Sequence, residues 1–402
     1  MTNPQPDIPE DPKPEYTFVQ TPEGVRDLAG ELSSCSEMAV DLEADSMYHY
    51  QEKVCLLQFS ACGKNWVVDP LAVGDLSPLA PAFANPGIRK VFHGADYDIR
   101  SLYRDFGICV ANLFDTQVAA CFLGYREIGL ANLIAERFGV HLEKKYQKSN
   151  WSRRPLPRDM LDYAAMDTVY LLELAHGLAE DLKAAGRLEW AVEESSLLCG
   201  VRPFEPNGEP LFLRFKGAGR LNRRTLAVLE SLLVFRDEEA RRLDRPPFKV
   251  MGNHSLLRIA EKKPRTMKEL EAIDNVTPKQ VRLFGKKILP RVKAAMALPE
   301  KELPVYPRPP RTRVDHRVSR RVQSLKEWRA EYAETLALDP GIMLNNAQIR
   351  ALAASCPKTR EDLDRMEEIR DWQKSALGAE LLSALARPPK KKKKAPEKTK
   401  KS

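Results

Sequence analysis

Two acidic residues two positions apart, Asp41 and Glu43, are the first residues whose spacing indicates chemistry. They lie in a short apolar run followed by turn-prone residues, which predicts a strand. Alternate side chains of a strand point to the same face, so both carboxylates would share one face. Burying two unpaired like charges is costly, and a divalent cation between them would remove much of that cost. An edge strand with a solvated acidic face would give the same pattern, so other carboxylates must decide.

Three further residues complete a candidate site. Asp98 follows a predicted strand and a short loop, at the start of a helix for which Asp96 is the expected cap. Asp167 lies in a predicted helix with Tyr163 four residues before it, a spacing that puts both on one helix face. Each residue alone has an ordinary explanation: a helix cap, a solvated helix charge or a half-buried core aromatic. The order and context of all five favour a shared site.

Metal-assisted phosphodiester hydrolysis is the chemistry that needs such a set. Mg²⁺ prefers hard oxygen ligands and binds through a few carboxylates, waters and substrate phosphates. Two such ions roughly 3.5–4 Å apart can stabilise both the attacking and the leaving oxygens. The set therefore predicts two divalent ions, Mg²⁺ or Mn²⁺, with the phenol beside the attacking water. The expected metal ligands are four: Asp41, Glu43, Asp98 and Asp167.

The elements around these residues indicate an α/β domain. Strand-like and helix-like runs alternate from about 17 to 110, with a hairpin expected around Cys62-Gly63. The chain is mostly helical from about 112 to 197, including one long amphipathic helix at about 158–185. Consecutive strands followed by strands interleaved with helices predict a mixed central sheet with flanking helices.

The rest of the chain reads as two all-helical domains, the second a loose repeat of the first. Proline-rich residues between them predict an extended, semi-rigid linker. The expected organisation is a disordered N-terminus at 1–15, the α/β domain at 16–200, helical domains at 217–298 and 318–387, the linker at 299–317 and a basic disordered tail at 388–402.

Length and composition set further limits. A chain of 402 residues predicts two to three domains. No apolar run is long enough to span a bilayer, and the acidic, proline-rich start is unlike a secretory signal. The seven cysteines are odd in number and scattered, without C-x-x-C pairs. They predict reduced thiols in a cytoplasmic protein, with neither a disulfide framework nor a zinc site.

Charge is distributed unevenly along the chain. The net charge is +8, while the tail at 389–402 holds eight Lys and one Glu, and residues 1–50 hold eleven acidic and two basic residues. The basic remainder favours a polyanionic partner such as nucleic acid. No P-loop supports an ATP-driven helicase.

The candidate motifs resemble a known family. The strand Asp41-x-Glu43, the segment at 93–102 and the pair Tyr163-x-x-x-Asp167 resemble the three exonuclease motifs of the DEDD superfamily, in the subgroup with tyrosine in the third motif. The segments at 114–117 and 151–156 are similar to those of the ribonuclease D family. Residues 217–298 resemble its HRDC module, and residues 318–387 resemble a second, diverged copy.

This resemblance implies an RNase H-like α/β fold followed by two HRDC-like domains. It implies stepwise 3′→5′ removal of nucleotides as 5′-monophosphates from the 3′ ends of tRNA precursors and other small structured RNAs. Asp41 would bridge both ions, Glu43 and Asp167 would hold the first, and Asp98 would act on the second. Tyr163 would position the attacking water. A monomer without membrane association is expected.

Two basic segments are candidate RNA contacts. Residues 141–160 hold six basic residues, with Tyr146 and Trp151 between them, and could flank a single-stranded 3′ end. A solvated loop anchored by Trp151 is the alternative. A basic cluster, Lys216, Arg220, Arg223 and Arg224, could touch RNA or face water. The motifs do not separate RNA from DNA, since that depends on contacts to the 2′-OH. A nucleic-acid-binding scaffold without activity is a third possibility, which the intact acidic set disfavours.

Overall fold

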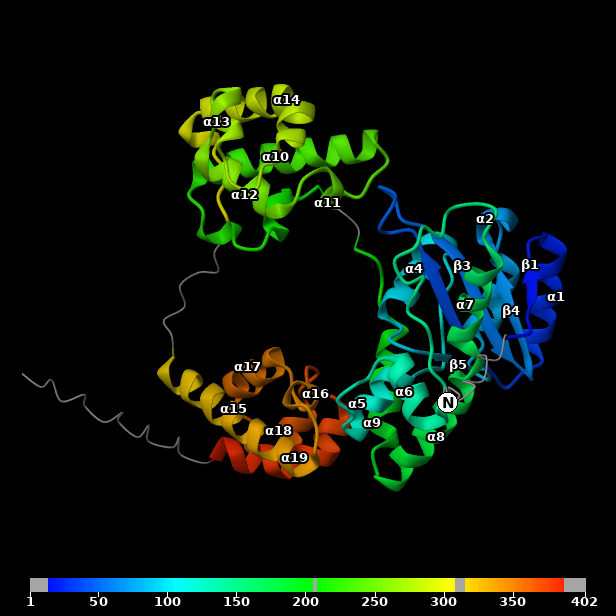
Figure 1. Cartoon of the computed structure of the whole chain (residues 1–402). Helices are drawn as coiled ribbons and strands as arrows, with labels where there is room; N and C mark the ends of the chain where they lie inside the picture. Colours follow the sequence, from blue (N-terminus) through cyan, green and yellow to red (C-terminus); the bar gives the residue numbers. More distant parts are fainter. Residues whose placement is uncertain (1–13, 205–207, 308–314, 387–402) are drawn as a thin grey trace, which may run out of the picture.

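A six-stranded mixed sheet forms the centre of the N-terminal part of the computed structural model, which describes residues 14–204, 208–307 and 315–386 (Figure 1). The strand order is β1-β4-β3-β2-β5-β6. The pairs β4/β3 and β3/β2 are antiparallel, and the other pairs are parallel. The strands are β1 (Thr17–Val19), β2 (Glu37–Ala44), β3 (Val54–Ala61), β4 (Lys64–Val68), β5 (Arg89–Phe92) and β6 (Leu113–Asp115).

The β3–β4 hairpin confirms the turn that Cys62-Gly63 predicts. These two residues form the whole loop, with φ of 48° and 75°. Two-residue hairpin loops with positive φ at both positions match the twist of the flanking strands. The sharp return places β4 beside β3, which is buried along its whole length.

Helices cover both faces of the sheet. On one face, Val25 and Leu28 of α1 and Leu102 of α4 pack in a core with Leu57 and Phe59 of β3. On the other face, α7 packs its small and apolar residues against β3 and β4. The helices of this part are α1 (Pro22–Ser33), α2 (Pro70–Val73), α3 (Ala80–Ala84), α4 (Asp96–Phe106), α5 (Thr116–Leu123), α6 (Leu130–Phe138), α7 (Arg158–Val169), α8 (Leu171–Ala184) and α9 (Leu188–Leu198), with a 3₁₀ turn η1 (Ser77–Leu79).

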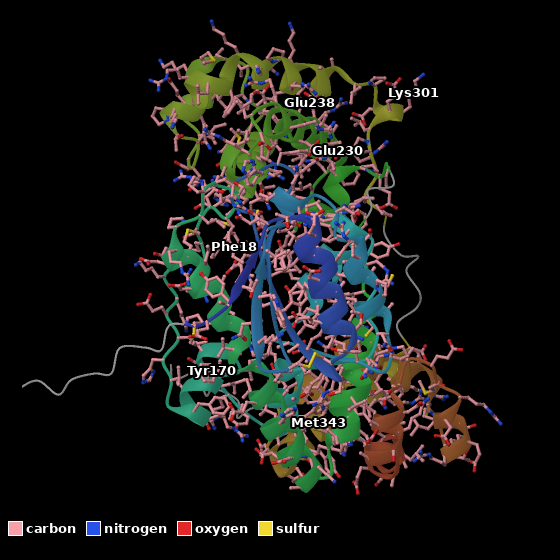
Figure 2. All side chains as sticks on the ribbon, turned by 90° about the vertical axis from the view of Figure 1, so that its right-hand side faces the viewer. Phe18, Tyr170, Glu230, Glu238, Lys301 and Met343 are labelled. Carbon is pink, nitrogen blue, oxygen red and sulfur yellow. A yellow bond between two sulfur atoms is a disulfide. The ribbon has the colours of Figure 1, made fainter. Side chains whose placement is uncertain are left out.

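The predicted single helix at 158–185 is wrong, because it is divided at Tyr170 into α7 and α8. Tyr170, labelled in Figure 2, ends one helix and begins the next. Its ring stacks on that of Phe138 of α6, with the ring centroids 5.7 Å apart. Helix α7 packs on β2, β3 and β4, whereas α8 packs mainly on α5. A bend between them lets each helix follow its own neighbour.

Two helical blocks follow, and they repeat one pattern. Helices α12 and α17 both end in a left-handed residue, Lys263 and Cys356, with φ of 53° and 51°. In both blocks the last helix carries a glycine, Gly285 or Gly378, against the short helix before it, where a Cβ would come within 3 Å of a side chain. The helices are α10 (Arg223–Arg242), α11 (Pro247–Val250), α12 (Asn253–Lys262), α13 (Met267–Glu271) and α14 (Pro278–Ala297), then α15 (His316–Leu336), α16 (Pro340–Met343), α17 (Asn346–Ser355), α18 (Arg360–Asp364) and α19 (Asp371–Ala386).

Both blocks contact the sheet domain, at separate places (Figure 1). The first block meets the segment after β2, where Nδ1 of His49 lies 2.7 Å from a carboxylate oxygen of Asp244. The second block packs on α5 and α9. There the ring of Trp372 stacks on Trp190 at 4.7 Å and meets Phe122 edge-on.

The segments that join these parts contain three 3₁₀ turns: η2 (Leu211–Arg214), η3 (Ala218–Arg220) and η4 (Glu300–Glu302). The tail at 388–402, most of the predicted disordered start at 1–15 and residues 308–314 of the linker lie outside the described residues. A mixed sheet with flanking helices followed by helical blocks confirms the predicted fold class. Among the helices that the structure describes, none is both long and apolar enough to cross a membrane.

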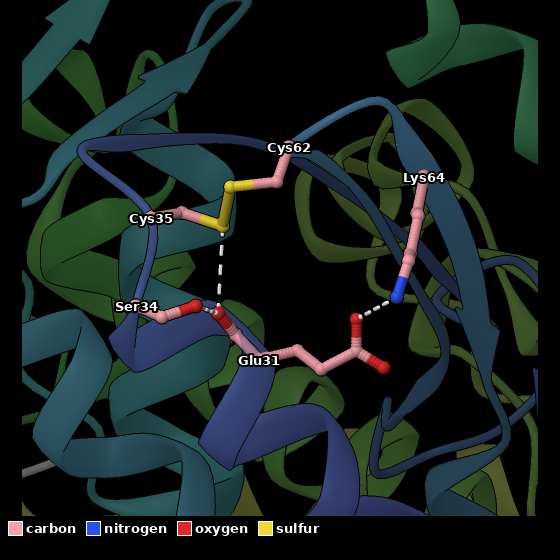
Figure 3. Close-up of a disulfide and its surroundings, with 5 residues drawn as sticks. All are labelled: Glu31, Ser34, Cys35, Cys62 and Lys64. Atoms are coloured by element: carbon pink, nitrogen blue, oxygen red, sulfur yellow. Dashed lines mark hydrogen bonds and ion pairs between the residues drawn. A yellow bond between two sulfur atoms is a disulfide. The ribbon is translucent and has the colours of Figure 1, made fainter.

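The expectation that all seven cysteines are reduced is wrong for one pair. Cys35, just after α1, forms a disulfide with Cys62 of the β3–β4 turn (Figure 3). The two residues are 27 positions apart, and the sheet brings their Cα atoms to 6.1 Å. The scattered positions of the cysteines in the sequence did not predict this disulfide. The cysteines therefore no longer support a cytoplasmic location.

Candidate active site

Asp41 and Glu43 lie on β2 beyond the last residue that pairs with β5. That pairing ends at Ala39 and Val91, while pairing with β3 continues along the rest of β2. The flanking Val40 and Leu42 pack in the core on the opposite face. The alternation therefore turns both carboxylates toward the face that α7 covers, where they line a cavity.

Asp98 is placed by the turn between β5 and α4. Gly94 has φ of 75°, and the backbone N–H groups of Gly94 and Ala95 donate to the carboxylate of Asp115, at 2.9 and 2.8 Å. Asp115 also caps α5 by accepting from the N–H of Gln117. One buried carboxylate thus fixes two helix starts, and Asp98 occupies the first turn of α4.

The predicted role of Asp96 as a cap is wrong. The residue at the N-cap of α4 is Ala95, and Asp96 follows it as the first residue inside the helix. Its carboxylate pairs with Arg100 one turn later, at 2.8 Å. Asp96 is exposed, paired with Arg100 and absent from the cavity wall, and its charge is the last of the causes that raise the pKa of Asp98.

Tyr163 and Asp167 lie on one face of α7, as their spacing predicts. The intervening Ala164 and Ala165 are buried against the sheet, and their small size lets the helix approach closely. The Tyr163 ring is held by two aromatic neighbours, Tyr146 at 5.6 Å and Trp151 at 6.1 Å. The helix therefore presents a phenol and a carboxylate in fixed positions.

A cavity of about 360 Å³ connects these elements. Its wall includes Asp41, Glu43, Tyr163 and Asp167, while Asp98 is buried. A second cavity of about 360 Å³ shares Tyr163 and Asp167 as part of its wall. The remaining polar lining of the first cavity comes from His93, Gln117, Glu143, Lys144 and Gln147.

The four carboxylates affect one another electrostatically. Burial raises the pKa of Asp41 to about 7. Burial, and then repulsion from Asp41, raises the pKa of Asp98 and Asp167 well above the usual range. Glu43 has a strongly raised pKa from burial and from repulsion by the other three. No Lys or Arg side chain among the described residues is a source of these shifts.

The chemistry of this donor set fits a hard divalent cation, because every candidate ligand is a carboxylate oxygen, and no Lys or Arg of the described residues is a cause of their pKa shifts. Within residues 14–204, 208–307 and 315–386, no three His, Cys, Asp or Glu side chains are close enough together to hold a metal ion as they stand. The four carboxylates are close enough to raise one another's pKa. Their mutual repulsion opposes a closer approach when no cation lies between them.

Several basic residues that sequence reasoning offered as RNA contacts are used inside the fold. Arg154 pairs with buried Asp69 through two nitrogens, at 2.6 and 2.7 Å. Arg223 and Arg224 donate to backbone carbonyls near the end of α14. Trp151 is buried, as the anchored-loop alternative proposed. Lys144 and Gln147 of the same loop remain at the cavity.

Sequence reasoning did not single out Gln117 or assign a role to His93. His93 binds Thr116 through Nδ1 at 2.9 Å, and burial lowers its pKa. The side chain of Gln117 lies close to Gly94: a Cβ added at Gly94 would be 3.2 Å from Oε1 of Gln117. The helix cap at Asp115 was the sequence signal that could have indicated Gln117. Asp115 accepts from the N–H groups of Gly94, Ala95 and Gln117, so Gln117 lies beside the turn before α4.

Comparisons with known proteins identify the family. The model of the 3′–5′ exonuclease family matches residues 16–183, and the HRDC domain model matches twice, at 225–292 and 319–385. Ribonuclease D of Acidiphilium cryptum is 30% identical over 356 residues, which cover 88% of this chain and 86% of that protein. Ribonuclease D of Gluconacetobacter diazotrophicus is 31% identical over 385 residues, which cover 92% of this chain and 93% of that protein.

A solved structure agrees with these relatives. Escherichia coli RNase D, described as an exoribonuclease involved in structured RNA processing, has a TM-score of 0.70 and 26% identity, with 92% of this chain and 98% of that chain covered. The similarity therefore extends over the sheet domain and both helical blocks. This chain belongs to the ribonuclease D family of hydrolytic 3′→5′ exoribonucleases.

Proposed function

We propose that this protein trims the 3′ ends of tRNA precursors and other small structured RNAs, one 5′-monophosphate at a time, with two divalent ions at the acidic cluster. The observation that carries the proposal is the electrostatic influence of Asp41, Asp98 and Asp167 on Glu43. Three of the four carboxylates, those of Asp41, Glu43 and Asp167, line one cavity with Tyr163. The proposed ligands are Asp41, Glu43, Asp98 and Asp167, and the ions are Mg²⁺ or Mn²⁺.

The bound ions would activate the attacking water and stabilise charge on the attacking and leaving oxygens. The chain itself supplies position. Asp41 and Glu43 hold fixed places on a central strand, and Asp98 is set by the Asp115 turn. Tyr163, braced by Tyr146 and Trp151, would hold the water in line through its phenolic oxygen.

The substrate end would enter between the acidic wall and the loop at 141–157. Lys144 lines the first cavity and Lys145 the second, so both can meet phosphates. The partly exposed ring of Tyr146 in this loop could stack on a base. A monomeric state and a cytoplasmic location are parts of the same proposal, and light scattering coupled to size exclusion tests the first.

The deciding assay uses a 5′-labelled RNA with a 3′ tail and its DNA equivalent, each incubated with Mg²⁺ or Mn²⁺. We expect a ladder that shortens from the 3′ end of the RNA and is lost in the double variant Asp41→Ala/Glu43→Ala. The matched control is Asp96→Asn, because Asp96 lies outside the cluster on the same helix as Asp98.

Degradation of RNA by the double variant at the wild-type rate would contradict the proposed site. Faster shortening of the DNA would contradict the proposed substrate class. A pre-tRNA trailer that is cut no faster than an unstructured RNA of equal length would contradict the narrower substrate assignment.

A further inference from the structure

Gln58 of β3 has a fully buried side-chain amide that makes no hydrogen bond. Its side chain is 0% exposed, and neither Oε1 nor Nε2 has a hydrogen-bond partner. Buried polar atoms in folded proteins are nearly always paired, because leaving them unpaired costs free energy. An apolar residue of similar size would fill the same place without that cost.

The sheet places this amide directly beside the acidic cluster. Gln58 lies opposite Asp41 on β2 and opposite Val67 on β4. Directly opposed residues of antiparallel strands share a face, with Cβ atoms about 4.5–5.5 Å apart. Ser60, two residues along β3, donates to Oγ1 of Thr168 in α7 at 2.9 Å. The row therefore faces α7, the helix that carries Tyr163 and Asp167.

The chemistry of the amide fits one neighbour in particular. A carboxylate that binds a cation through one oxygen leaves lone pairs that can accept from an N–H group. Partners of this kind orient metal ligands, and their loss typically lowers metal affinity or activity about 10–100-fold. Asp41 is the carboxylate opposite Gln58. The backbone N–H of Leu42 donates to it, and among the described residues no side chain is a recorded donor.

We propose that Gln58 is a positioning residue, whose Nε2 donates to the carboxylate of Asp41 when divalent ions are bound. This inference rests on the proposed function, because it assigns the second partner of a carboxylate that the proposal makes a metal ligand. Gln58 does not touch the substrate, so its effect should fall on metal affinity and kcat and leave KM for RNA unchanged.

Gln58→Met tests the inference, since it removes both polar atoms and keeps most of the volume. We expect the Mg²⁺ and Mn²⁺ concentrations for half-maximal activity to rise about 10–100-fold. The half-saturation point of the Mn²⁺-induced rise in Tm should move by the same factor. The Tm of the metal-free variant should equal or exceed that of wild type, because an unpaired buried amide is gone.

The matched control is Ser60→Ala, on the same strand and face. Ser60 has partners in Thr168 and in Asn65, at 2.9 and 2.6 Å. Its loss should lower the metal-free Tm and leave metal half-saturation and kcat unchanged. The inference therefore predicts opposite results for the two variants in metal half-saturation and in metal-free Tm. If Gln58 were purely structural, Gln58→Met would lower the metal-free Tm and leave metal half-saturation unchanged, as expected for Ser60→Ala.

A second test measures whether the effects of substituting Gln58 and Asp41 on Mn²⁺ affinity depend on each other. If Gln58→Met does not fold, Gln58→Leu replaces it. In an Asp41→Asn background, the Gln58 substitution should cause no further loss of Mn²⁺ affinity, as measured by the Tm shift. Additive losses, or wild-type metal half-saturation in the single variant, would overturn the inference. If wild type itself shows no metal-dependent Tm shift or activity, the proposed function has failed instead.

Discussion

Tyr163 shows how much a single side chain does in this site. Tyr163 lines both cavities, and burial, followed by the charges of Asp167, Glu43 and Asp41, raises the pKa of its phenol. The phenol therefore stays protonated at neutral pH and can donate to or accept from a water molecule. A protonated phenol is not suited to serve as a base, and under the proposed function it would hold a water molecule in place.

Removal of the Tyr163 hydroxyl should slow the reaction without harming the fold. Tyr163→Phe keeps the ring contacts with Tyr146 and Trp151. We expect kcat to fall about 10²-fold with KM for RNA nearly unchanged, since the lost interaction acts on the attacking water. Steady-state kinetics on the labelled RNA give both values. Tyr146→Phe is the matched control, and a kcat for Tyr163→Phe within threefold of wild type would exclude this role.

The raised pKa of Asp41 predicts how stability depends on pH. The carboxyl contributes stability that is fully present below the pKa of an unfolded Asp, about 4, and is lost as the pH rises through the folded value of about 7. The Tm of the metal-free protein should therefore fall between pH 4 and pH 8. Saturating Mg²⁺ should restore it most strongly above pH 7, where the ion no longer competes with protons.

Asp41→Asn should remove part of this dependence. We expect the metal-free variant to melt a few degrees above wild type at pH 8, while it lacks activity. Asp27→Asn, on the exposed face of α1, should follow the wild-type curve. Thermal scans from pH 4 to pH 8 in the presence of a chelator measure both. A variant that melts below wild type at pH 8 would show that the carboxylate stabilises the metal-free fold.

At the scale of elements, the Asp115 turn is the part that sets Asp98. Asp115→Ala removes the acceptor for the N–H groups of Gly94, Ala95 and Gln117. We expect the free energy of unfolding to fall by about 2–4 kcal/mol and kcat to fall at least tenfold at a temperature where the variant is folded. Urea denaturation and kinetics at 25 °C measure these effects.

Asp75→Ala is the control for this variant, because Asp75 caps an exposed turn at Ser77 in the same domain. It should cost less than about 1 kcal/mol and leave kcat unchanged. Full activity in Asp115→Ala would mean that the position of Asp98 does not depend on the turn.

The elements explain what could and could not be predicted from the sequence. Local patterns sufficed for the hairpin at Cys62-Gly63, since positive φ at two turn residues is a local property. The spacing of Tyr163 and Asp167 likewise predicts their shared helix face. The break at Tyr170 was missed because it follows from two different packing partners for α7 and α8. Gln58 was missed because its neighbour, Asp41, is set by strand register across the sheet.

At the scale of the whole molecule, the second helical block is fixed to the sheet domain by Trp372. Its ring contacts Trp190 and Phe122, and its Nε1 donates to Glu194 at 2.9 Å. Because the contacts join residues far apart in the chain, with 178 positions between Trp372 and Glu194, local sequence patterns do not predict them. The docked block forms one continuous core with α5, α8 and α9.

Loss of this ring should release the block. Trp372→Ala should reduce stability by about 3–5 kcal/mol and increase the radius of gyration in small-angle X-ray scattering. Limited proteolysis should then cut in the segment between the two helical blocks more rapidly. Trp328→Phe, inside the block beside Tyr332, is the control and should leave the radius unchanged. An unchanged radius for Trp372→Ala would show that other contacts suffice for docking.

The number of Mn²⁺ ions that the full chain binds tests the central claim most directly, because it measures the acidic cluster without any substrate. Electron paramagnetic resonance of free Mn²⁺ during a titration gives this number. We expect two ions per chain for wild type and for Asp96→Asn, and loss of this binding in Asp41→Ala/Glu43→Ala. Equal binding by wild type and the double variant would contradict this expectation, and would place the metal chemistry of this enzyme elsewhere.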